Sequence, residues 1–590
     1  MIIMENTKWI ATVACIWIQC SSGASYTFGI YSAVLKSSQG YDQSTLDTVS
    51  VFKDIGANIG ILSGLLYDGI THNHRGSGLS FVYMVGAVQC FAGYFLMWLS
   101  MTGVIDRPHV LLMCLFMFLA AHAQTFFNTA NVVVAVRNFP DYGGTGVGIM
   151  KGFLGLSGAI LIQIYQTLFD GKPTNFVLML AIFPTLVSLA LMSLVHANPS
   201  NTTNDKPHLN RFSLIALIIA AYLMVILILE NIFSFPSWAH IVSTTVLVLL
   251  VLSPLQIALR AQRNEQQPAP PSPDTTPLIT GPEAPHVGVE MNLIQAMCTI
   301  NFWLLFLAMV CALGSGLATI NNVTQLGESL DYSTVEINAM ISLWSIWNFL
   351  GRFGGGFVSD FYLHKYGWGR PLFISFTQLG MIIGYLIIGS SGNLYIGSVI
   401  VGVCYGSQWS LMPTITSEIF GVKHMGTIFN TIATANPIGS YILSVQVIGN
   451  IYDKQAREIG GSCHGIHCFM LSYFIFGGVC VLGVVVSFVL FLRTRFGNLF
   501  IKFRFLFGNC DVVLNGGGRE SVKSATLQNS KGKRGRTAGT VPHQIINRHL
   551  IFLKGYPLET ALPGTVFPRP LANCKLIGHK HKHNHPYADQ

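Results

Sequence analysis

The chain has 590 residues, of which 51% are hydrophobic and only 10% are charged. A soluble globular domain usually has about 25% charged residues, so this composition excludes a cytosolic globular fold. The net charge of +9 is unevenly distributed. The segment from Arg493 to the end holds 16 of the 34 Lys and Arg residues and 4 of the 25 Asp and Glu residues, so it carries +12 and the rest of the chain −3.

Long apolar runs predict an all-α polytopic membrane protein, because about 20 apolar residues can cross a bilayer as a helix. The second run is the weakest, since Lys53, Asp54 and Asn58 interrupt it, and twelve spans are therefore the lower alternative to fourteen. The fourteen runs are 9–34, 48–67, 79–101, 109–135, 147–169, 175–195, 212–233, 238–259, 299–320, 335–358, 372–390, 393–413, 425–449 and 469–492.

Composition shifts divide these runs into five predicted segments. A proline-rich polar stretch, "QQPAPPSPDTTPLITGPEAP", separates the apolar runs and is typical of a disordered linker. Lys and Arg are more frequent in alternate loops, which predicts that both termini are cytoplasmic. The predicted segments are an N-terminal six-helix half (1–195), a central helical hairpin (196–259), a disordered cytoplasmic linker (260–297), a C-terminal six-helix half (298–495) and a basic cytoplasmic tail (496–590).

The two six-helix halves share a repeated motif. "GLLYD" places Gly64 four residues before Asp68, and "GFVSD" places Gly356 four residues before Asp360. Each motif ends the second span of its half and precedes a basic loop and four more spans. Paired six-helix halves are a transporter architecture, in which the solute binds between the halves near the midplane of the membrane.

This motif resembles the signature of the major facilitator superfamily, and longer stretches are similar to one plant subfamily. Its members are the nodulin-like proteins, often named nuclear-fusion-defective-4-like. The resemblance runs from about residue 9 to residue 495 and is absent from the tail. The stretches that carry it are "GYDQSTLDTVSVFKDIGANIG", "RNFPDYGGTGVGIMKGFLGLSGAI", "GSGLATINNVTQLGESLDYS", "SLWSIWNFLGRFGGGFVSD" and "QWSLMPTITSEIFGVKHMGTIFN".

The resemblance implies a major facilitator fold with the hairpin as a central two-helix insertion. It also implies that the repeated motif is a conformational latch between the halves; the alternative is a solvated loop acid. An Asp at a helix end can accept bonds from backbone N–H groups and pair with a basic residue. The latch candidates are Gly64, Asp68, Arg75, Arg352, Gly356, Asp360 and Arg370.

Polar side chains within the spans are candidates for a substrate cavity. In the fourth span, Gln124, Asn128 and Asn131 share one helix face, and such a face is turned toward the bundle or a cavity rather than lipid. Hydrogen bonding between helices explains them equally well. His122 lies roughly opposite, as either a proton-coupling group or a structural histidine. The second half adds Trp347, Asn348, Tyr405, Gln408 and Asn436.

Lys151 is an unusual cavity candidate because it lies four residues inside an apolar span. Its ammonium either reaches the cytoplasmic interface or points into the cavity and attracts an anion. Gly148, Gly152 and Gly155 follow one face of the same helix. Small residues let membrane helices approach closely, so this face predicts close packing against a neighbouring helix.

The predicted function is a secondary carrier of a small solute that works by alternating access. The resemblance extends to oxalate/formate-type carriers, which indicates an organic anion, with proton coupling as an option. A carrier-like sensor or scaffold without transport is the alternative. No enzyme, cofactor or metal motif is present, and no nucleic-acid partner is expected. We expect "CHGIHC" (463–468) to form a local disulfide rather than a zinc site, since four ligands at the usual spacing are absent.

The linker holds a candidate sorting signal. Asp274, Leu278 and Ile279 fit the pattern Asp-x-x-x-Leu-Ile, which an adaptor protein would bind in a flexible cytoplasmic segment. This pattern favours an endomembrane address such as the vacuole, with the plasma membrane as the alternative.

Overall fold

The computed structural model describes residues 7–73, 78–169, 172–197, 205–233, 235–266, 290–391, 393–459 and 463–506. All of them belong to one compact unit, Met1–Cys510. Arg75 and the sorting residues Asp274, Leu278 and Ile279 lie outside the described residues, as does the tail after residue 506.

The described residues form helices and no strands, which confirms the predicted all-α class. Among them, ten helices are long and apolar enough to cross a membrane. The number of spans remains a prediction. Of the four other predicted runs, 9–34 and 425–449 are divided into shorter elements, whereas 335–358 and 393–413 each fall on one continuous helix, Thr334–Tyr366 and Leu394–Phe420.

The first half contains the helices that carry the first copy of the motif. Its second predicted span is divided into α3 and α4 by a short break at residues 59–60. The elements are α1 (Lys8–Ser22), the 3₁₀ turn η1 (Ala24–Thr27), α2 (Phe28–Gln39), α3 (Gln43–Asn58), α4 (Ile61–Asn73), α5 (Gly78–Met101), α6 (Val110–Asn138), α7 (Gly143–Leu168), α8 (Pro173–Leu191) and the 3₁₀ turn η2 (Met192–Leu194).

The predicted central hairpin is formed by α9 (Asp205–Ile232) and α10 (Ser237–Leu252), followed by α11 (Pro254–Gln266). It packs against α1 and α7 of the first half, and α9 also contacts α15 (Thr334–Tyr366) of the second half. At its start, the Lys8 ammonium of α1 lies 2.6 Å from the Asp205 carboxylate of α9.

The second half contains the helix that carries the second copy of the motif, α15. Its last helix continues past the predicted end at residue 492. The elements are α12 (Leu293–Met297), α13 (Ile300–Asn321), α14 (Val323–Ser329), α15, α16 (Pro371–Ser391), α17 (Leu394–Phe420), α18 (Met425–Ala433), α19 (Ala435–Ser440), the π-helix η3 (Tyr441–Gly449), α20 (Asn450–Ile459) and α21 (His467–Leu506).

Local chemistry explains where the helices start and break. At the start of α15, Ser333 and Glu336 form a reciprocal capping box, which satisfies free backbone N–H groups. Gly60 lies at the break between α3 and α4, where a side chain would collide with the Asn430 side chain. Pro437 lacks a backbone N–H, and the predicted run around it is interrupted between α18, α19 and η3.

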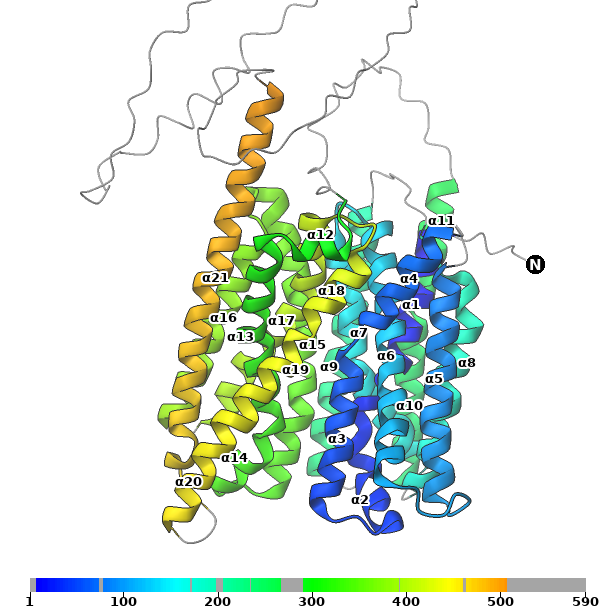
Figure 1. Cartoon of the computed structure of the whole chain (residues 1–590). Coiled ribbons are helices and arrows are strands. Elements are labelled where there is room, and N and C mark those ends of the chain that lie inside the picture. The colour runs from blue at the N-terminus through cyan, green and yellow to red at the C-terminus, as the bar shows by residue number, and fades with distance from the viewer. Residues whose placement is uncertain are drawn as a thin grey trace, which may run out of the picture. The chain divides into compact units, whose positions relative to one another are not determined.

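The helices run side by side between two ends of the bundle (Figure 1). The helices α11 and α12 and the extension of α21 lie at one end, which we call the inner end. The helices α2, α14 and α20 lie at the opposite, outer end (Figure 1). α7 is the most fully buried of the ten candidate spans.

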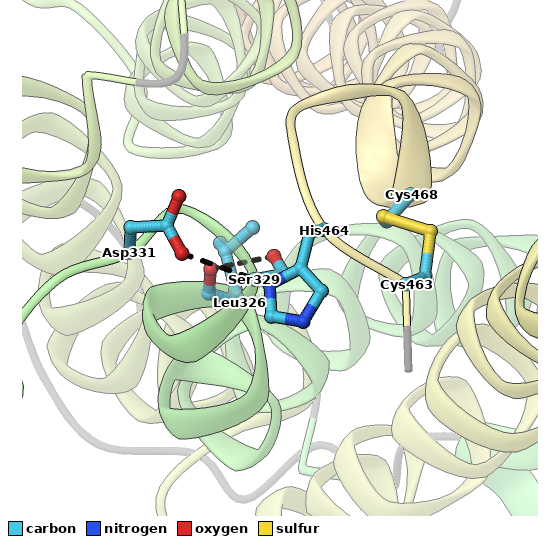
Figure 2. Close-up of a disulfide and its surroundings, with 6 residues drawn as sticks. All are labelled: Leu326, Ser329, Asp331, Cys463, His464 and Cys468. Atoms are coloured by element: carbon cyan, nitrogen blue, oxygen red, sulfur yellow. Dashed lines mark hydrogen bonds and ion pairs between the residues drawn. A yellow bond between two sulfur atoms is a disulfide. The ribbon is translucent and has the colours of Figure 1, made fainter. Parts of the chain in front are cut away.

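A disulfide closes the loop before α21. Cys463 and Cys468 are bonded, which confirms the predicted local disulfide. Figure 2 shows this loop beside the end of α14, where the Gly465 N–H donates to the Ser329 carbonyl at 2.7 Å. The His464 ring lies 3.6 Å from the Asp331 carboxylate. The loop therefore joins the outer ends of helices that are distant in the sequence.

Candidate functional site

The second copy of the motif joins the two halves at the inner end. The Asp360 carboxylate of α15 accepts hydrogen bonds from the N–H groups of Gly144 (3.2 Å) and Thr145 (2.6 Å) and from the Thr145 hydroxyl (2.7 Å). These groups open α7, whose own preceding residue, Tyr142, supplies no side-chain cap. Asp360 thus caps a helix of the opposite half, where the helix dipole favours a negative charge.

The two arginines predicted as partners of this acid are used differently. Arg370 contacts the Asp360 carboxylate and also Glu418. Arg352, on α15 about two turns deeper, instead donates from Nη1 to the Lys151 carbonyl of α7 at 3.1 Å. Arg352 therefore adds a second link between α15 and α7 without contacting the motif acid.

The first copy of the motif makes a matching contact between α4 and α18. The Asp68 carboxylate accepts from the Thr427 hydroxyl at 2.5 Å and lies 3.1 Å from the His424 ring. Gly64 allows this approach, since a Cβ there would lie 2.5 Å from the Thr427 Cα. We call this contact and the α7–α15 contact together the inner contact. Each joins one half to the other through an Asp of the repeated motif.

The glycine face of α7 packs against α15, a helix of the opposite half. A Cβ on Gly148 would lie 3.1 Å from the backbone carbonyls of Arg352 and Phe353, and one on Gly152 would lie 3.0 Å from the Phe349 ring. The predicted close packing of this face is therefore present in the structure.

A cavity of about 340 Å³ lies between the halves, beyond the inner contact. Its volume is within the range of small-molecule sites, about 300–1,000 Å³. Polar amides and aromatic rings make up much of its wall. Six predicted residues line it, namely Gln124, Asn128, Lys151, Asn348, Tyr405 and Asn436.

Two cations from opposite halves line this cavity. Lys151 is 2% exposed and Arg352 is 4% exposed. Among the described residues, no carboxylate lies within ion-pair distance of either. A third cavity cation, Lys53, differs because its ammonium is 3.2 Å from the Asp54 carboxylate. The cavity therefore combines one internal ion pair with two buried cations that have no carboxylate partner in the part of the chain that the structure describes.

Aromatic rings surround the Lys151 ammonium. It lies 5.0 Å from the centre of the Trp409 ring and 5.7 Å from that of Phe429. Cation–π attraction compensates part of the hydration that the ammonium has lost. This position differs from the alternative in which Lys151 extends to the membrane interface.

Four predicted cavity residues lie elsewhere. The His122 ring bonds to the Gln89 side chain at 2.9 Å, and Asn131 accepts from the Tyr83 hydroxyl at 2.5 Å. Gln408 donates to the Met381 sulfur at 3.2 Å. Trp347 borders a separate apolar hollow of about 160 Å³. These side chains bond or pack between helices and do not line the cavity.

Sequence reasoning missed Tyr26 in the cavity wall. Tyr26 belongs to η1, which interrupts the first span, and its hydroxyl lies 3.5 Å from Arg352 Nη2. Gly158 packs at its base, where a Cβ would lie 2.9 Å from the Tyr26 Cβ. The available signal was the run of small and polar residues "QCSSGASYT", which is a poor continuation of an apolar helix.

Comparison with known proteins adds two family matches. The nodulin-like family matches residues 8–259, and the NFD4 C-terminal domain matches residues 285–500. Protein NUCLEAR FUSION DEFECTIVE 4 of Arabidopsis thaliana is 26% identical over 532 residues, which cover 83% of this chain and 89% of that protein. The probable transporter MCH1 of Yarrowia lipolytica is 28% identical over 207 residues, covering 32% of this chain and 41% of that protein.

A solved structure has a similar fold. The proton:xylose symporter XylE of the major facilitator superfamily, bound to 6-bromo-6-deoxy-D-glucose, aligns with a TM-score of 0.51 at 12% identity. The alignment covers 81% of this chain and 94% of that chain. At this identity the likeness concerns the fold alone.

Proposed function

We propose that this chain, which belongs to the nodulin-like, nuclear-fusion-defective-4-like subfamily of the major facilitator superfamily, is a secondary carrier of a small organic anion. Membrane transport itself follows from the family and from the probable transporters among its relatives. The solute class and the mechanism are our proposal.

One observation carries the choice of an anion: the cavity presents Lys151 and Arg352 without a carboxylate of the protein beside either, among the described residues. An unpaired charge removed from water costs several kcal/mol. A carboxylate of the solute between these cations would compensate both. Because the cations belong to opposite halves, such a solute would also bridge the halves.

The proposed transport cycle starts from the arrangement described above. The inner contact closes the cavity toward the N-terminal side, which we take to be the cytoplasm from the distribution of Lys and Arg. Solute would enter from the outer end and bind Lys151 and Arg352. Separation of α7 from α15 and of α4 from α18 would then open the inner side. In this scheme Asp68 and Asp360 are the conformational latch.

Flux and binding measurements on purified protein test this proposal. Radiolabelled organic acids, amino acids and sugars are offered to reconstituted vesicles, and binding is followed by thermal shift. Loss of one hydrogen bond to a charged group costs about 1.5–3 kcal/mol, or about 10-fold to 150-fold in affinity. We therefore expect Lys151→Ala and Arg352→Gln each to weaken anion binding by this amount. Lys172→Gln removes an exposed lysine and is the matched control.

Three outcomes would overturn parts of the proposal. Selective binding of a neutral or cationic solute would exclude the anion class. Unchanged affinity in the Lys151 and Arg352 variants, at normal abundance, would place the anion elsewhere. Anion binding without flux in any condition would favour the alternative of a non-transporting sensor or scaffold.

We also propose an endomembrane location, supported by the sorting pattern in the linker. Replacing Leu278 and Ile279 together by Ala should move a fluorescent fusion toward the plasma membrane, since an adaptor would lose its apolar anchors. An unchanged distribution would refute the signal.

A further inference from the structure

The outer end of the central hairpin contains a buried acid that the transport scheme does not use. Glu230 lies near the end of α9, inside a helix apolar enough to span the membrane. Its side chain is 8% exposed. Acids at such positions are costly and usually functional, and they pair with a partner inside the protein.

The partner of Glu230 is a histidine of the second hairpin helix. The His240 Nδ1 atom on α10 lies 3.4 Å from Glu230 Oε1. Both atoms are buried, and neither has a hydrogen-bond partner among the described residues. The other carboxylate oxygen, Oε2, accepts from the Gln163 amide of α7 at 2.8 Å. One oxygen of Glu230 thus faces an imidazole within ion-pair distance, while the other is already bonded.

The same pair lies at the point where the hairpin joins α7. The Thr167 hydroxyl of α7 and the Thr244 hydroxyl of α10 are 2.6 Å apart. The Ser243 hydroxyl donates to Gln163 Oε1 at 3.3 Å. Gln163 therefore connects both hairpin helices to the helix that carries Lys151 and the groups bound by Asp360.

Among the described residues, His240 is the nearest group to Glu230 that can carry a positive charge. On α9 itself, Tyr222 is the titratable neighbour of Glu230, and its hydroxyl donates to the Ser243 carbonyl. From α7, the neighbours of Glu230 are the uncharged amides of Gln163 and Gln166.

We propose that Glu230 and His240 form a proton-binding site that fastens the outer end of the hairpin to α7. With a proton on the imidazole, the pair is a buried ion pair, and Glu230 holds both hairpin helices and Gln163 together. Without it, the carboxylate keeps its charge and loses its cationic neighbour, so the fastening weakens. An unperturbed histidine changes charge near pH 6.5, in the range that separates acidic compartments from the cytosol.

A double-mutant cycle in thermal stability tests the site without any need for a known solute. Purified protein is melted at about pH 5.5 and about pH 8.5, on either side of the usual histidine range. The variants are Glu230→Gln, His240→Gln and the double variant. We expect a coupling of about 2 °C or more in Tm at the acidic pH and little or none at the alkaline pH. Glu328→Gln, which removes an exposed acid at the outer end, should show no coupling with His240→Gln.

Two results of the double-mutant cycle would contradict the proposed proton-binding site. Equal coupling at both pH values would mean that the pair is held by a bond independent of protonation. No coupling at either pH would mean that the two side chains do not interact. Either result overturns the proposal, and both can be read even if the chain carries no organic anion.

A flux measurement tests the consequence for α7. If the proposed carrier activity holds, acidifying only the side of the α9–α10 loop should change flux in the wild type and leave flux in Glu230→Gln and His240→Gln unaffected. An equal response in the variants would place the pH dependence elsewhere. Loss of flux in all proteins would refute the proposed function but not the site, which rests on the melting data.

Discussion

Asp360→Asn should release the inner contact while leaving the fold intact. The Asp360 carboxylate is 2% exposed and accepts three hydrogen bonds from the first turn of α7. An asparagine of the same size keeps one acceptor oxygen and presents an NH₂ group where the other oxygen was. At least one N–H of α7 then loses its acceptor, and the helix start loses its negative partner.

The size of this effect follows from the kind of bond that is lost. A hydrogen bond to a charged group contributes about 1.5–3 kcal/mol, so the closed arrangement should lose about 10-fold to 150-fold in population relative to the open one. Arg370 would keep its contact with Glu418, so the loop between α15 and α16 should stay bound to α17. The contact made by Asp68 remains in place, so we expect the lower part of this range.

Cysteine labelling from the inner side measures the change. Ser63 is buried on α4, where its hydroxyl lies 2.7 Å from that of Thr129. Ser63→Cys should react slowly with a membrane-impermeant maleimide in a background in which the exposed Cys298 and the tail residues Cys510 and Cys574 are replaced by Ser. Adding Asp360→Asn should speed the reaction about 10-fold or more, in line with the population shift.

A matched variant separates this effect from a general loss of charge. Asp106→Asn removes an exposed acid in the loop between α5 and α6 and should leave the labelling rate unchanged. If Asp360→Asn folds normally and labels no faster than the Asp106 variant, the capping of α7 by Asp360 does not hold the inner contact closed, and the reasoning fails.

Three further changes test other parts of the structure. Gly64→Val should prevent close approach to Thr427 and reduce the monodisperse yield in size-exclusion chromatography, because its Cβ would lie 2.5 Å from a backbone atom. The sequon at Asn322 should stay unglycosylated, since its amide donates to the Ala318 carbonyl at 2.7 Å and to a side chain of η3. Cys463→Ser should lower Tm by a few degrees, because closing so short a loop contributes about 2 kcal/mol.

Each of these expectations has its own contrary result. Gly69→Ala is the control for Gly64, since nothing lies within 4 Å of an added Cβ at Gly69. Equal yields of the two variants would show that the tight approach at Gly64 is not needed. A mobility shift after glycosidase treatment would contradict the statement on Asn322. A reduced protein that melts at the temperature of the oxidised one would show that the disulfide contributes nothing to stability.

The fold was readable from sequence because its signals are local and repeated. Apolar runs predict membrane helices one at a time, and the two copies of Gly-x-x-x-Asp mark equivalent places in the two halves. The close approach of Gly60 to the Asn430 side chain was not predictable, because Asn430 is distant in the sequence. Likewise, nothing near Asp360 in the sequence indicates that it caps α7.

The cavity residues were only partly readable for a related reason. Helical periodicity places Gln124, Asn128 and Asn131 on one face, and the first two line the cavity. Asn131 lies about two turns further along α6 than Gln124, and its side chain accepts from the Tyr83 hydroxyl of α5 instead. Periodicity gives the direction of a side chain on its own helix, whereas the neighbour that it meets depends on how other helices are placed.

The glycine-rich contact between α7 and α15 has a consequence for the speed of the proposed transport cycle. Backbone faces backbone there, with Gly144 and Gly148 opposite Gly356. Along this stretch, one helix could slide past the other without a rotamer change at these glycines, which have no side chains. The barrier to movement should then come mainly from the few polar links of this contact, made by Asp360 and Arg352. The number of such links, rather than the area of the contact, should therefore set how fast the halves separate.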